Sequence, residues 1–128
     1  MLKCSGIPPL FGLACTLVQS ITELTKTLLT KKPEVTAITI SFVPDTLWFV
    51  NGQPLADQDT RSFYLDIKVT DFTNTKDQKK AYIHAIDQLL GSLPGTMVNA
   101  SYVYVQEIKA DAYGFGGLTM EHRYIVNA

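Results

Sequence analysis

The chain has 128 residues, of which 46% are hydrophobic and 18% charged, and its net charge is −1. This length and composition predict one globular domain over residues 1–128, and the lack of a basic run argues against nucleic acid as a partner. No apolar run approaches the ~18–20 residues of a membrane span, and the histidines and cysteines lack metal-ligand spacing, so we expect neither membrane nor metal binding.

The first half of the chain, residues 1–43, has the pattern of a strand, a helix and a second strand. A short strand is expected at residues 2–7. The next apolar residues recur at three- and four-residue steps, the spacing of one helix face: Leu10, Leu13 or Ala14, Leu17, Ile21, Leu24 and Leu28. Pro33 ends this helix because proline disfavours helical geometry in the preceding residue. Residues 35–43 then alternate between apolar and polar side chains, which predicts a half-buried strand.

The apolar residues 7–18 loosely imitate an export signal, with Ala14 and Cys15 imitating a lipoprotein cleavage site. Pro8 and Pro9 interrupt that run, and the helical pattern continues past Cys15. We therefore expect a cytoplasmic protein, with an exported domain as the distant alternative.

The second half, residues 62–128, repeats the plan. Residues 62–70 and 101–108 alternate as strands, and the helix between them begins where Thr75 and Gln78 have the spacing of a capping box. Its apolar stripe comprises Tyr82 or Ile83, Ile86, Leu89 and Leu90. Residues 114–117 predict a turn, and residues 123–126 a short final strand.

These two β-α-β units predict an α+β fold in which a four-stranded mixed sheet carries two helices on one face. Strands joined by a helix-length crossover pair in parallel, which fixes the pairing within each unit. The uncovered face of the sheet would be polar but rich in tyrosine. It would be either solvated or packed against a partner.

Five segments, taken in order, resemble the tautomerase superfamily: residues 31–34, 43–52, 66–70, 74–80 and 110–119. The closest likeness is to the longer 4-oxalocrotonate tautomerase-like proteins, with a fainter one to macrophage migration inhibitory factor. The resemblance implies a homotrimer, no metal or organic cofactor, and small carboxylate substrates that are enols, 2-oxo acids or unsaturated acids. It also implies that an N-terminal proline amine moves a proton to and from carbon.

The sequence departs from the family at this amine, because Leu2 follows Met1. Pro8 and Pro9 cannot replace the missing proline, since an internal proline nitrogen is an amide. Three explanations remain open: a wrongly assigned start, a Met1 amine that acts as a weaker base, or a loss of catalysis. With a wrongly assigned start, the catalytic amine would be that of an upstream proline; with a weaker base, it would be that of Met1. If catalysis is lost, Met1 is a frayed terminus.

The resemblance also points to residues that would bind substrate. Lys32 matches a lysine that binds a substrate carboxylate, whereas the neighbouring Lys31 is expected only to interact with the dipole at the C-terminus of the first helix. Arg123 would form a second carboxylate contact, or would be exposed at the surface. Tyr104 would donate a hydrogen bond to the developing enolate, or would pack with Tyr102 at a subunit interface. The further expected substrate contacts are Tyr102, Ile67 and Trp48, although a lone tryptophan such as Trp48 is more often a core or interface residue.

The sequence therefore predicts a cofactor-free tautomerase of small enol or 2-oxo acids, impaired if the proline is truly missing. The alternative is a trimeric binding or structural protein that kept the fold and lost the base.

Overall fold

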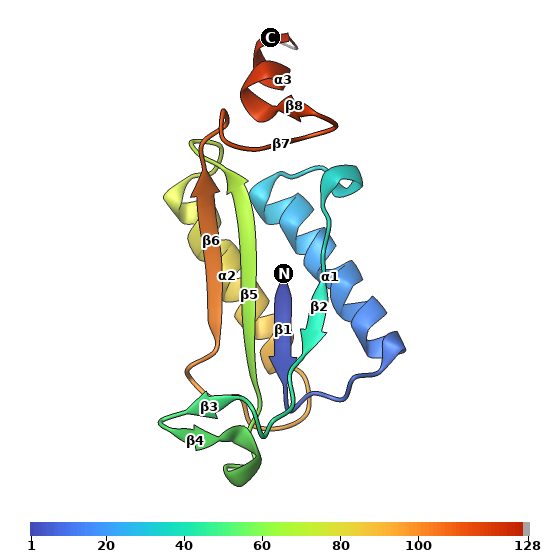
Figure 1. Ribbon diagram of the computed structural model, residues 1–128, viewed down its shortest axis with the longest axis vertical. Helices are drawn as coiled ribbons and strands as arrows, with labels where there is room; N and C mark the ends of the chain where they lie inside the picture. Colours follow the sequence, from blue (N-terminus) through green and yellow to red (C-terminus); the bar gives the residue numbers. More distant parts are fainter. Residues whose placement is uncertain (127–128) are drawn as a thin grey trace.

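The computed structural model describes residues 1–126. Within these residues, a four-stranded sheet in the order β2–β1–β5–β6 carries the two long helices on one face (Figure 1). The strands are β1 (Leu2–Ser5), β2 (Ile40–Phe42), β5 (Ser62–Thr70) and β6 (Tyr102–Ile108), and the helices are α1 (Phe11–Leu29) and α2 (Lys76–Gly91). The pairs β1–β2 and β5–β6 are parallel, whereas β1 and β5 are antiparallel. The predicted mixed sheet of tandem β-α-β units is thus confirmed.

Shorter elements connect and extend this sheet. A 3-10 turn η1 (Pro33–Val35) precedes β2, and a hairpin of β3 (Phe49–Val50) and β4 (Gln53–Pro54) leads into the 3-10 turn η2 (Leu55–Asp57). After β6, the hairpin of β7 (Gly114–Phe115) and β8 (Leu118–Thr119) is followed by α3 (Met120–Val126). This C-terminal part projects beyond the end of the sheet (Figure 1).

The strand expected at residues 35–43 is shorter than predicted, and its neighbour explains why. In the parallel register, Leu2 lies opposite Ile40, and the main-chain nitrogen of Leu2 donates to the carbonyl of Thr39 at 2.9 Å. Strand β1 does not extend far enough to pair with residues 35–38. The alternating pattern there is present, but no partner strand forms a ladder with it.

The short strand expected at residues 123–126 is wrong, because this segment belongs to α3. The hydroxyl of Thr119 accepts a hydrogen bond from the main-chain nitrogen of His122 at 3.0 Å, an N-cap interaction that favours a helix. Four residues are too few for alternation to distinguish a strand from a helical turn.

The core lies between the sheet and the two helices, as the apolar stripes predict. Its fully or almost fully buried helical residues are Leu17, Ile21, Thr25 and Leu29 from α1 and Tyr82, Ile86 and Leu90 from α2. Leu10 is not part of the stripe; it is the N-cap residue and 61% exposed. Of the two alternatives on α2, Tyr82 is the buried one.

One polar contact joins the two helices inside this core. Thr25 donates to the carbonyl of Ile21 at 2.7 Å, and its hydroxyl lies 2.9 Å from the hydroxyl of Tyr82. Burial raises the pKa of Tyr82, while the hydrogen bond with Thr25 partly offsets this shift. Both buried hydroxyls are thereby satisfied, which removes most of their desolvation cost.

Helix α2 is fixed at both ends. The predicted capping box is present, with Thr75 accepting from the main chain of Gln78 and the Gln78 side chain accepting from Thr75. At the other end, the buried Arg61 donates to the carbonyls of Leu90 at 2.6 Å and Gly91 at 3.3 Å. A cation at a helix C-terminus also interacts favourably with the helix dipole.

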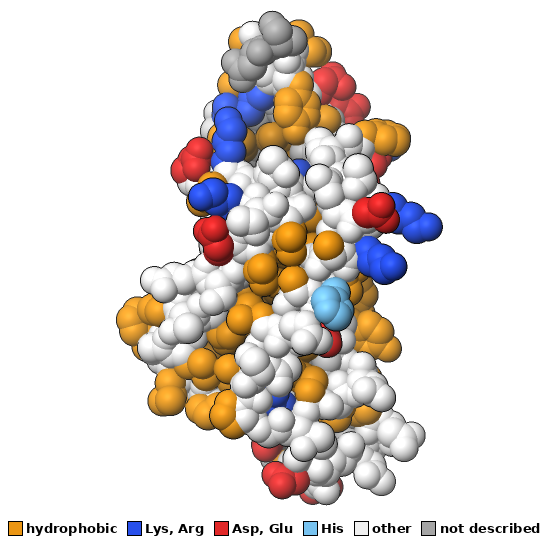
Figure 2. Space-filling model, turned by 180° about the vertical axis from the view of Figure 1, so that it is seen from behind, with side chains coloured by type: hydrophobic (Ala, Val, Ile, Leu, Met, Phe, Trp, Pro, Cys, Tyr) orange, Lys and Arg blue, Asp and Glu red, His pale blue; other side chains and the backbone are white. Residues whose placement is uncertain are grey.

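The helix-covered side of the molecule shows Lys, Arg, Asp and Glu side chains of both signs, without one large patch of either sign (Figure 2). Within residues 1–126, no helix combines the length and the apolar character needed to cross a membrane.

Candidate active site

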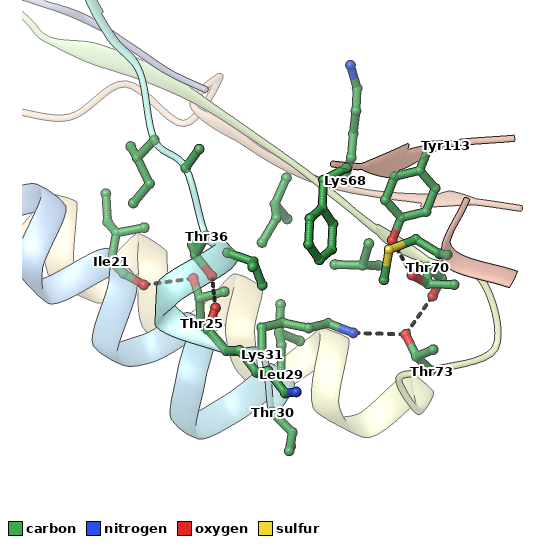
Figure 3. Close-up of a pocket in the computed structure, with 18 of the residues that line it drawn as sticks. Ile21, Thr25, Leu29, Thr30, Lys31, Thr36, Lys68, Thr70, Thr73 and Tyr113 are labelled. Atoms are coloured by element: carbon green, nitrogen blue, oxygen red, sulfur yellow. Dashed lines mark hydrogen bonds between the residues drawn. The ribbon is translucent and has the colours of Figure 1, made fainter. Parts of the chain in front are cut away.

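A cavity of about 1150 Å³ lies between the C-terminal end of α1, the start of β1, the C-terminal half of β5 and the projecting β7–β8–α3 unit. Four of the residues predicted from the sequence line it: Met1, Lys32, Ile67 and Arg123. Figure 3 shows part of this cavity, with side chains from α1, β5 and the segments that follow them. The topology therefore brings together residues up to 122 positions apart.

Met1 is held as part of the sheet rather than frayed. Its amino group donates to the carbonyl of Asp66 at 2.7 Å, and its own carbonyl accepts from the main-chain nitrogen of Asp66 at 2.9 Å. The next residue, Leu2, is fully buried in the core. The amine is thus fixed at the wall of the cavity by the same strand that carries Ile67.

Lys32 lies at the N-cap of η1 with an exposed side chain, so its ammonium group borders the cavity and stays in contact with solvent. Lys31, the residue before it, was expected to interact only with the helix C-terminus. Instead its amine donates to the hydroxyl of Thr73 at 2.9 Å within the cavity, and burial lowers its pKa. The Lys31 side chain points this way because Thr30 has a left-handed backbone, at φ 58°. Sequence patterns do not reveal that backbone conformation.

Three hydroxyl groups gather at the end of β5, and no sequence pattern indicated them. Thr70 is hydrogen-bonded to the hydroxyl of Tyr113, and the hydroxyl of Tyr124 donates to Thr70 at 3.2 Å. All three residues line the cavity. They come from a strand, a loop and a helix, so no local spacing in the sequence links them.

Arg123 is packed against the β7–β8 hairpin. Its guanidinium carbon lies 3.8 Å from the centre of the Phe115 ring, and one terminal nitrogen donates to the carbonyl of Phe115 at 2.8 Å. The close approach requires a residue without a side chain at Gly116, where a Cβ atom would lie 2.9 Å from that guanidinium. The Nε atom of Arg123 is buried and has no hydrogen-bond partner within residues 1–126.

The cavity lining is rich in basic groups: the Met1 amine, Lys31, Lys32, Lys68 and Arg123. Its carboxylates are those of Glu34 and Asp66, and both oxygens of Asp66 accept from Gln106 at 2.7 Å. An excess of cations over carboxylates in a partly enclosed space attracts anions. The lining is therefore suited to a small carboxylate.

Trp48, Tyr102 and Tyr104 do not line this cavity. Trp48 is almost fully buried and packs on Tyr64, with ring centroids 4.7 Å apart, while Tyr102 and Tyr104 stack at 5.8 Å. The three tyrosines form a cluster on the uncovered face of the sheet, and they are 37–49% exposed. We call Tyr64, Tyr102 and Tyr104 the tyrosine face.

The part of the chain described here contains no group of three or more His, Cys, Asp or Glu side chains positioned to hold a metal ion.

No protein-family model and no curated protein matches the sequence, but solved structures match the fold. F6 fused 4-OT, a wild-type asymmetric trimer, has a TM-score of 0.71 at 21% identity, covering 95% of this chain and 97% of that one. Pt0534, inactivated by 2-oxo-3-pentynoate, has a TM-score of 0.76 at 12% identity over 94% and 95% of the two chains. A macrophage migration inhibitory factor-like protein from Entamoeba histolytica has a TM-score of 0.72 at 14% identity over 92% and 94%. The chain therefore has the fold of the tautomerase superfamily, as its motifs predict.

Proposed function

We propose that the protein is a cofactor-free tautomerase of small enol or 2-oxo acids, with the Met1 amine as base. The observation that carries this proposal is the position of that amine. It is fixed by its 2.7 Å bond to the carbonyl of Asp66, at the wall of a cation-rich cavity.

In this mechanism, the neutral amine of Met1 takes a proton from the enol hydroxyl or from a carbon beside the carbonyl, and returns it at the other position. The exchange needs no external oxidant or cofactor, because one proton leaves and one returns. The hydrogen bond to Asp66 uses one N–H of the amine, so its lone pair is limited to the two remaining directions.

Substrate binding is assigned to the two predicted cations that line the cavity. Arg123 presents a planar guanidinium that can hold a carboxylate through two parallel hydrogen bonds from its terminal nitrogens. Lys32 contributes a mobile charge at the edge of the cavity. Ile67 forms an apolar part of the cavity wall beside Asp66 and shields the carbon skeleton of the substrate from water.

Tyr104 remains the proposed donor to the developing enolate, although it lies on the tyrosine face and not in the cavity of its own chain. Its role therefore requires an assembly in which a neighbouring subunit presents Tyr104. A homotrimer is proposed on two grounds: F6 fused 4-OT, which has this fold, is a trimer, and the tyrosine face is aromatic and half-exposed. Aromatic residues are enriched at protein interfaces relative to the rest of the surface.

The test is ketonisation of phenylenolpyruvate by the purified protein over a range of pH. A second form carries one additional residue before Met1, which converts its amine into an amide and leaves every lysine unchanged. We expect turnover above the buffer rate that is lost in the extended form. Equal turnover by the two forms would refute Met1 as the base.

The second candidate function is binding without catalysis by an assembled protein. It is favoured by the bulky, fully buried Leu2 at the position after Met1, where the family pattern has proline. No turnover from a properly assembled trimer would select this candidate.

A further inference from the structure

The cavity holds a second amine that the proposed mechanism does not use. We propose that Lys31 forms an imine with the carbonyl carbon of a 2-oxo acid, giving the cavity a covalent activity that is separate from proton transfer by Met1. The substrate class rests on the proposed function, but the covalent step does not depend on Met1.

The backbone directs Lys31 away from the helix and into the cavity. Helix α1 ends at the left-handed Thr30, and the main-chain nitrogen of Lys31 donates to the carbonyl of Thr25 at 3.4 Å. The side chain then runs along the cavity toward the segment that precedes α2, where its amine meets Thr73 (Figure 3). The amine is therefore held by Thr73, a residue 42 positions away in the sequence.

The contact with Thr73 does not require a charged amine. The hydroxyl of Thr73 donates its single hydrogen to the carbonyl of Thr70 at 2.6 Å, so its oxygen is left to accept from Lys31 at 2.9 Å. An acceptor of this kind is satisfied equally by an ammonium group and by a neutral amine. Thr73 thus positions the nitrogen without forcing it to stay protonated.

No carboxylate stabilises the charged form of Lys31. Within residues 1–126, the one ion pair joins Lys79 and Glu107, and the Asp66 carboxylate accepts from Gln106. Partial burial lowers the pKa of Lys31 because the charged form loses hydration. By contrast, the side chains of Lys32 and Lys68 are exposed. A desolvated lysine without a counter-ion is the type of amine that attacks carbonyl groups.

The hydroxyl of Tyr113 supplies the acid that imine formation needs, because the hydrogens of Thr73 and Tyr124 are already donated to Thr70. Thr73 is linked to the main chain of Thr70, and the side chain of Thr70 is hydrogen-bonded to Tyr113 and Tyr124. Lys31, Thr73, Thr70 and Tyr113 lie together at one end of the cavity (Figure 3). The exposed Lys68 and the guanidinium of Arg123 line the same cavity and are available for the carboxylate of the substrate.

The step balances without a further reactant. The nitrogen lone pair of Lys31 forms a bond to the carbonyl carbon while the carbonyl oxygen takes up a proton. The resulting carbinolamine loses its hydroxyl group, with a second proton, as water, and a C=N bond replaces the C=O bond. Hydrolysis reverses the step and releases the 2-oxo acid.

The test is trapping of this imine in the full chain with pyruvate, the simplest 2-oxo acid, and sodium cyanoborohydride. Reduction leaves a stable secondary amine that mass spectrometry assigns to one residue. We expect the adduct on Lys31, and we expect its yield to fall at least about tenfold in Lys31→Arg, which keeps the charge and removes the nucleophile. The matched control is Lys26→Arg, on the exposed side of the last turn of α1.

An adduct located only on Met1, Lys32 or Lys68, or an adduct yield unchanged in Lys31→Arg, would overturn the proposal. So would the absence of any adduct. The form extended before Met1 separates the two proposals, because it should lose ketonisation and still be trapped at Lys31. Ketonisation without trapping refutes only the imine, and trapping without ketonisation refutes only the role of Met1.

Discussion

The amino group of Met1 and the carbonyl of Asp66 are joined by a hydrogen bond of 2.7 Å, and Asp66 returns a bond of 2.9 Å from its main-chain nitrogen to the carbonyl of Met1. This reciprocal pair extends the antiparallel register of β1 and β5 to the first residue. Any amine at this position is therefore presented to the cavity in a defined orientation.

A proline in place of Met1 should raise the rate of ketonisation. The variant Met1→Pro is encoded after an initiator methionine, which is removed when a small residue such as proline follows. Its N-terminal proline is a secondary amine that can still donate to the carbonyl of Asp66. Because ring closure fixes the direction of its lone pair, we expect kcat/KM to rise by about tenfold or more. The control is Met1→Ala, which keeps a primary amine with a smaller side chain. Equal rates for the proline and alanine forms would contradict this prediction.

Removal of the guanidinium at Arg123 should weaken substrate binding more than turnover. Arg123→Gln loses both the stacking on Phe115 and the charge-assisted contact with a carboxylate, and such contacts contribute about 1.5–3 kcal/mol. We expect KM for phenylenolpyruvate to rise about tenfold or more, with a smaller change in kcat. The exposed His122→Gln on the same helix should leave KM unchanged. A rise in KM of equal size in both variants would point to disruption of α3.

A charge placed on the tyrosine face should dissociate the proposed trimer. Tyr104→Glu would bury a carboxylate at the interface without a partner, which is costly. We expect sedimentation velocity to show a smaller species than the wild-type protein. His84→Glu, on the exposed side of α2, should sediment like the wild type. An unchanged sedimentation coefficient for Tyr104→Glu would mean that the tyrosine face is exposed to solvent and is not an interface.

The sequence predicted those parts of the fold in which side chains alternate between core and solvent. In β5 and β6, for example, Leu65 and Val103 face the helices while Tyr64 and Tyr102 are exposed. Periodicity works here because each strand has one buried face. It fails at Thr25, a polar residue in an apolar stripe, because its burial depends on Tyr82 of another helix.

The sequence predicted four of the residues that line the cavity and missed others, such as Thr70 and Tyr113, that lie within the resembling segments. Met1, Lys32, Ile67 and Arg123 were placed in one cavity by the fold. Lys31 was missed, because its direction depends on the backbone of Thr30. Contacts made by tertiary structure between distant residues leave no local pattern.

The buried thiol of Cys4 should make the protein less stable at alkaline pH. Cys4 is fully buried in β1, and burial raises its pKa from 9.0 to about 11. Between these two values the unfolded chain has lost the proton and the folded chain still holds it, so stability falls as pH rises. Two pKa units correspond to a loss of about 2.7 kcal/mol, which is complete only above the folded pKa.

Urea unfolding at pH 8 and at pH 10.5 measures this loss. Cys4→Ala removes the thiol and should show a smaller decrease in the free energy of unfolding between the two pH values, although its stability at pH 8 is lowered by the missing sulfur. Cys15→Ala, which removes the partly exposed cysteine of α1, should retain the full decrease. Because other groups titrate equally in all three proteins, the difference between the variants isolates the thiol. An identical decrease in Cys4→Ala and the wild type would show that the Cys4 thiol ionises as readily in the folded chain as in the unfolded one.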